Sequence, residues 1–103
     1  MILDDDAKLY LYSPVELTVD PTGSTVELEV GSTRYAMAWQ GSPVAGIGKW
    51  TQTARTTAKF CGSSTTAVGT DVKLAAGIYD LQVIVTPTDG QVIPGPRDEM
   101  KVN

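Results

Sequence analysis

The stretch Leu74-Ala75-Ala76-Gly77-Ile78-Tyr79-Asp80-Leu81-Gln82-Val83-Ile84-Val85 decides the fold of this chain. A corner containing a glycine leads into a run whose apolar residues alternate with the rest. Successive side chains of a β-strand point to opposite faces, so a period of two is typical of a strand with one buried side. We therefore predict a strand here. The residues assigned to the fold are Gly77, Tyr79, Leu81, Val83 and Val85.

Other short runs with strand-like sequence lie on both sides of this stretch. Residues 15–19, 25–30 and 34–39 alternate, and the Thr-rich run 50–61 favours a strand over a short helical turn. Asp20-Pro21-Thr22-Gly23 has the residues of a tight turn, and residues 40–48, with three glycines, are predicted to form a loop. Turn signals that recur about every 8–12 residues are typical of an all-β architecture.

A tyrosine shortly after a glycine, at the entry to a strand, resembles the tyrosine corner of immunoglobulin-like domains. In that motif the ring enters the core and the hydroxyl bonds to backbone a few residues upstream. We therefore predict an all-β fold, an immunoglobulin-like antiparallel β-sandwich of about seven short strands, with Trp39 as a core tryptophan. Cys61 is the only cysteine, so the fold has no intramolecular disulfide.

The length of 103 residues predicts one domain with one modest core. Residues 1–7, a short apolar tip followed by three acids, are predicted to be an N-terminal arm, and residues 8–103 the domain. The N-terminus lacks the basic region and apolar core of a signal peptide, so we expect no secretion by the classical pathway. No apolar run approaches the ~20 residues of a membrane span, so we expect no membrane partner.

The charge of the chain disfavours nucleic acid as a partner. The net charge is −4, and the eight basic residues are scattered, whereas phosphate binding needs clustered Lys and Arg. Lys49, Arg55 and Lys59 are a candidate local basic patch, which we interpret mainly as a solvated or protein-facing surface.

Little in the sequence points to catalysis or to a cofactor. The chain has no histidine, the most common general base and metal ligand. Cys61 is predicted to be a small buried residue, the alternative being a reactive thiol. Glu27 and Glu29 share a strand face and are expected to be solvated, not a glycosidase pair. We therefore predict no enzyme activity, no catalytic residue, no metal site and no cofactor.

The N-terminal segment and three aromatic residues are the candidates for protein contacts. Asp4-Asp5-Asp6 is expected to be a solvated acidic segment that docks on a basic neighbour, the alternative being a Ca²⁺ site. Tyr10, Tyr12 and Trp50 fit an interface and a core equally well. The candidate interface residues are Ile2, Leu3, Asp4, Asp5, Asp6, Tyr10, Tyr12 and Trp50. The predicted loop that precedes Trp50 is a further candidate.

The order of segments across most of the chain resembles a known family. VDPTGSTVELEV leads to a strand ending in Trp39, KWTQTARTTAKFCG follows, and the chain closes with LAAGIYDLQVIVTPTDGQVIPGP. This pattern is similar to the small virion structural proteins of tailed phages that infect actinobacteria, several of which carry the ending Leu-x-x-Gly-x-Tyr-x-Leu-x-Val-x-Val. The resemblance implies a β-sandwich without a catalytic role.

What the resemblance implies for function is a capsid decoration or minor capsid protein that binds and stabilises the head shell. Its partners would be the major capsid protein, other virion proteins or further copies of itself. Its location would be the virion, assembled in the host cytoplasm. A tail, neck or baseplate component is the alternative with the same fold. A carbohydrate-binding module is a third hypothesis, which depends on an exposed Trp50.

Overall fold

The computed structural model describes residues 1–66 and 71–103. Within these ranges the regular structure is all β, and no helix has the length and apolar character needed to cross a membrane. The described strands are β1 (Ile2–Leu3), β2 (Lys8–Leu9), β3 (Tyr12–Leu17), β4 (Thr25–Val30), β5 (Thr33–Gly46), β6 (Lys49–Thr56), β7 (Phe60–Cys61), β8 (Val72–Lys73), β9 (Gly77–Thr86) and β10 (Ile93–Val102).

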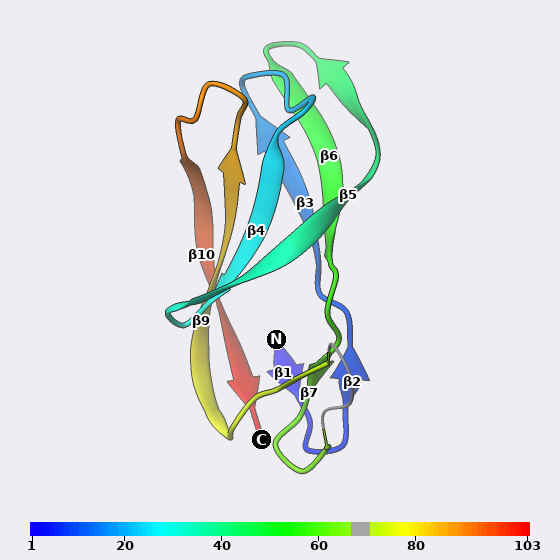
Figure 1. Cartoon of the computed structure of the whole chain (residues 1–103), viewed down its shortest axis with the longest axis vertical. Helices are drawn as coiled ribbons and strands as arrows, with labels where there is room; N and C mark the ends of the chain where they lie inside the picture. The colour runs from blue at the N-terminus through cyan, green and yellow to red at the C-terminus, as the bar shows by residue number, and fades with distance from the viewer. Residues whose placement is uncertain (67–70) are drawn as a thin grey trace.

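The strands form one curled sheet and one small sheet. The large sheet has seven strands in the order β1-β10-β9-β4-β5-β6-β3, and the small sheet has the order β2-β7-β8. Neighbouring strands are antiparallel except for the β1–β10 and β7–β8 pairs, which are parallel. Figure 1 shows the β5–β6 hairpin at the upper end of the molecule and the small sheet, with both chain ends, at the lower end.

The long strand β5 joins the two halves of the large sheet. Residues 33–36 pair with β4, whereas the part from Met37 to Gly46 pairs with β6, and Figure 1 shows β5 crossing diagonally between them. The prediction of a loop over residues 40–48 is wrong, because most of this segment continues the hairpin. A bulge between Gln40 and Val44 absorbs the unpaired residues, and the chain reverses at Ile47-Gly48, where Gly48 has a φ of 69°.

The alternation of apolar residues places the core inside the curl. Val26, Leu28 and Val30 of β4 are buried, as their spacing predicts. On β9, Leu81 and Val85 are buried, and Tyr79 and Val83 are half-buried against the same core. Side chains that are completely or almost completely buried include Leu3, Phe60, Met100 and Val102.

The tyrosine corner is present. The hydroxyl of Tyr79 donates to the carbonyl O of Ala75 at 2.7 Å, which fixes the turn that leads into β9. Trp39 is only half-buried, because its indole N–H donates to the carbonyl O of Ser24 at 3.0 Å and holds the ring at the margin of the core. The aromatic centre of the core is instead Phe60, whose ring packs edge-on against Tyr35 at 5.1 Å.

The N-terminal segment is part of the folded domain. The backbone N–H of Lys101 donates to Met1 O, and that of Asn103 donates to Leu3 O, both at 3.0 Å. Leu3 is fully buried in the core of its own chain, so its side chain is not available to a partner, contrary to its assignment as an interface residue. Residues 1–7, expected as an arm, therefore lie against the domain instead of projecting from it.

Candidate functional site

Two tyrosines and two basic residues come together where the large sheet meets the small one. Tyr12 and Arg55 are direct partners across β3 and β6. Leu11 is buried and its N–H donates to the hydroxyl of Thr56, which turns the tyrosines on either side of it outward. We call the group of Tyr10, Tyr12, Arg55 and Lys59 the aromatic–basic cluster. The sequence named these residues in two separate predictions, and the structure joins them.

The contacts within the cluster are cation–π contacts. The guanidinium carbon of Arg55 lies 4.0 Å from the ring centre of Tyr10 and 5.9 Å from that of Tyr12. Arg55 Nη1 also donates to the hydroxyl of Tyr12 at 3.4 Å. Lys59 Nζ lies 5.4 Å from the ring centre of Tyr10. Tyr10 thus stabilises two cations at the same time.

The two cations of the cluster differ from most other basic residues of the chain. Within residues 1–66 and 71–103, neither Arg55 nor Lys59 has a carboxylate within ion-pair distance. The four basic residues that form ion pairs are Lys8, Arg34, Lys49 and Arg97. Lys49 pairs with Glu16 at 3.0 Å near the hairpin tip and is not part of the cluster, so the predicted basic patch is wrong in that member.

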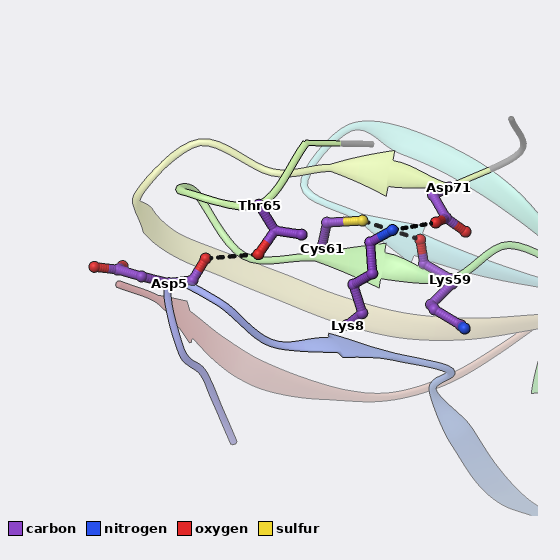
Figure 2. A network of polar contacts seen from close by, with 6 residues as sticks. All are labelled: Asp5, Lys8, Lys59, Cys61, Thr65 and Asp71. Carbon is purple, nitrogen blue, oxygen red and sulfur yellow. Dashed lines mark hydrogen bonds and ion pairs between the residues drawn. The ribbon is translucent and has the colours of Figure 1, made fainter. Parts of the chain in front are cut away.

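The small sheet carries an ion pair and the free cysteine. Lys8 Nζ bonds to Asp71 Oδ2 at 2.9 Å, and this hydrogen bond raises the pKa of Lys8 above its ordinary value. Cys61 is fully buried, as predicted, and its thiol lies 3.9 Å from the carbonyl O of Lys59. Figure 2 shows this group, with the pair formed by Lys8 and Asp71 spanning from β2 to the start of β8.

Of the three N-terminal acids, Asp5 is held by the turn after β7. The carbonyl O of Asp5 accepts from the hydroxyl of Thr65 at 2.9 Å, a contact drawn in Figure 2, and from the N–H of Ser64 at 3.1 Å. Asp4 Oδ1 accepts from the side-chain amide of Asn103 at 3.0 Å. In the part of the chain that the structure describes, no group of three or more acidic or cysteine side chains is placed to hold a metal ion.

An open groove runs between β3, at one edge of the large sheet, and β10, which pairs with the short strand β1 at the other edge. Its upper part has a volume of about 780 Å³, and its lower part, which also contacts Ser13, Pro14, Val83 and Pro96, has a volume of about 320 Å³. The apolar residues that line the groove include Leu11, Val15, Leu17, Leu28, Met37, Val44, Leu81, Val83, Val85 and Ile93. The groove therefore combines an apolar lining with polar side chains such as Ser13 and Gln52.

The other predicted site residues are dispersed. Ile2 is 64% exposed and Ile78 is 66% exposed, and Lys101 stands between them in register on β10. Trp50 is half-buried opposite Leu17. Glu27 and Glu29 face Arg34, with ion-pair distances of 3.9 and 3.2 Å, and belong to the solvated face of β4.

Reasoning from sequence missed the groove altogether. The available signal was proline: Pro14 lies in β3, and Pro94 and Pro96 lie in β10. Prolines within strands are confined to sheet edges or bulges, because they lack a backbone donor. They mark the edge strand β3 and the part of β10 that precedes its pairing with β1.

Comparison with known proteins adds no assignment. No protein-family model, curated protein or solved structure matches the chain.

Proposed function

We propose that this chain is a non-enzymatic structural protein of a tailed-phage virion, a capsid decoration or minor capsid protein that binds and stabilises the head shell. The proposal starts from the resemblance of the chain to such proteins, whose shared ending includes Gly77 and Tyr79. It also takes the curled sheet as an immunoglobulin-like sandwich. In that interpretation β5 passes from one layer to the other at Met37, and the small sheet closes the lower end.

The observation that carries the proposal is the groove between the open edge of β3 and the edge of β10, which β1 covers only in part. The N–H of Thr56 donates to the carbonyl O of Leu11 at 2.9 Å, so the antiparallel alternation directs the backbone groups of Tyr12 and Glu16 outward from β3. On β10, the backbone groups of Lys101 that point away from β9 pair with β1. Those of Arg97 point the same way but lie beyond the end of the β1 pairing. Open edges beside an apolar groove are features that pair with a neighbouring polypeptide.

The residues of the groove favour contact over catalysis. Its polar lining is mainly hydroxyl and amide side chains, such as Ser13, Ser42 and Gln52, and Glu16 is held by Lys49. General acid–base catalysis needs a titratable group with a suitable pKa near the reacting atoms. A groove of this composition suits the apolar and hydrogen-bonded contacts of a protein interface.

Co-sedimentation with phage heads that lack this protein tests the proposal. We expect many copies per head, counted against the major capsid protein, and heads that resist heat better when the protein is bound. Binding of a few copies, or binding to tails alone, would instead support a neck, tail or baseplate role. Absence of binding to any virion part would overturn the proposal.

A matched pair of variants connects the assay to the groove. Ser13→Arg places a long charged side chain at the middle of the groove, whereas Ser32→Arg adds the same charge on the exposed turn after β4. We expect Ser13→Arg to reduce head binding and Ser32→Arg to leave it unchanged, with both variants checked for folding by circular dichroism. Equal binding of the two variants would exclude the groove as the contact surface.

A further inference from the structure

We propose that the aromatic–basic cluster binds a carboxylate-rich segment of the partner protein, with Arg55 as the principal contact. The inference rests on the proposed function, because it names the chemistry of the surface that a virion partner would present. The cluster adjoins the lower part of the groove, which Tyr12 also lines.

The cluster is a site of positive charge on a chain that is acidic as a whole. The chain carries twelve acidic residues against eight basic ones, and yet Arg55 and Lys59 have no acid within ion-pair distance among the described residues. Their distances to Tyr10 place the two cationic groups within about 10 Å of each other, the Debye length at 0.1 M salt. Their fields therefore add, and the cluster is a local positive surface on an acidic protein.

The side chain of Arg55 is already held in place before a partner binds. Arg55 is stacked on Tyr10 and bonded to the hydroxyl of Tyr12, so less side-chain freedom is lost when it binds. Stacking occupies a face of the guanidinium and leaves N–H groups at its edge free. That edge matches the two oxygens of a carboxylate in a bidentate pair, a geometry that an ammonium group cannot reproduce.

The small number of basic residues in the cluster favours a carboxylate ligand over nucleic acid phosphates. Binding to a nucleic acid backbone uses several Lys and Arg residues along a stripe, and the cluster holds two. The net charge of −4 also repels a polyanion at long range. A short acidic segment of a folded protein carries fewer charges and meets less of this repulsion, so it is the better match.

The test uses the full chain and defined probes. Hexaglutamate, hexaglutamine and a thymidine hexanucleotide are titrated into the isotope-labelled protein and followed by NMR, at low and at high salt. We expect hexaglutamate to shift the signals of the cluster at low salt and hexaglutamine to leave them unchanged. Arg55→Gln with Lys59→Gln should weaken hexaglutamate binding about tenfold or more, because charge-assisted hydrogen bonds are lost.

Two further variants define the cause. Lys73→Gln with Lys101→Gln removes the same two charges from β8 and β10, and we expect it to bind hexaglutamate as the wild type does. Arg55→Lys keeps the charge but removes the planar fork, and we expect it to weaken binding severalfold. If both double variants weaken binding equally, net charge alone is responsible and the inference is overturned.

The remaining outcomes separate the inference from the proposed function. Tighter binding of the hexanucleotide at the cluster would overturn the inference in favour of phosphate. If wild-type protein binds heads and the Arg55→Gln, Lys59→Gln variant binds them equally well, the inference fails and the proposed function stands. If the wild type binds no virion part but binds hexaglutamate at the cluster, the proposed function fails and the preference for carboxylate stands.

Discussion

Substitution of Gly62 by alanine is expected to detach the N-terminal segment from the domain. A methyl group on this residue would lie 1.9 Å from Asp4 O and 2.6 Å from Asp5 O. Both neighbours are backbone atoms, so no side chain can move aside to relieve the clash. The segment that follows β1 must shift away from the turn after β7, because the two backbones can approach this closely only at a glycine.

The cost follows from the hydrogen bonds that this shift breaks. They are Gly62 N–H to Ala7 O at 2.8 Å, Ser64 N–H to Asp5 O at 3.1 Å, and the hydroxyl of Thr65 to Asp5 O at 2.9 Å. Each contributes about 1 kcal/mol net, so we expect Gly62→Ala to lower the free energy of unfolding by about 3 kcal/mol. For a domain of this size the melting temperature should fall by more than about 10 °C.

Urea unfolding followed by fluorescence, together with a thermal scan, measures this effect. Gly46→Ala is the matched control, since its added methyl group would lie 3.6 Å from the nearest atom, an ordinary contact. We expect the control to stay within about 0.5 kcal/mol of the wild type, as is usual for substitutions at the surface. If Gly62→Ala is equally neutral, the close approach of the N-terminal segment is not part of the native structure and the reasoning is refuted.

Three other predictions concern the corner, the core and the small sheet. Tyr79→Phe removes the hydrogen bond to Ala75 O and should lower stability by about 1 kcal/mol in urea, and an unchanged midpoint would contradict a structural role for the hydroxyl. Phe60→Ala empties a fully buried site and should lower the unfolding free energy by about 3–5 kcal/mol, with a loss below about 1 kcal/mol excluding Phe60 from the core. Asp71 raises the folded pKa of Lys8 above 10.5. Any difference in unfolding free energy between the wild type and Lys8→Met is therefore fully present below that pH. It should decline as the pH rises through the folded value, and a difference that grows at alkaline pH would contradict the ion pair.

The strands with clean alternation were predictable, since one buried face suffices to specify them. The runs around Val26 and Leu81, and the corner at Tyr79, are of this kind. The continuation of β5 past Gln40 was not predictable, because three glycines and a proline are typical of a loop. Pairing with β6 and a bulge compensate for those residues, and both depend on a strand that comes later in the chain.

The candidate site was predictable in part. Tyr10, Tyr12 and Arg55 were each identified by residue type, but their contact depends on the register between β3 and β6. Leu3 was misassigned because an apolar residue beside three acids has the same local pattern in a free arm and in an edge strand. Only the partner strand, about a hundred residues later in the chain, distinguishes the two.

The pairing of β1 with β10 also sets the order of events during synthesis of the chain. Ile2 and Leu3 leave the ribosome about a hundred residues before their partners Lys101 and Val102. Contacts so distant in sequence form slowly, since the entropic cost of closing a long loop comes before the contacts can stabilise the fold. The fold is therefore completed after translation of β10. A nascent chain stalled before Met100 keeps Leu3 uncovered, where chaperones or neighbouring chains can capture it.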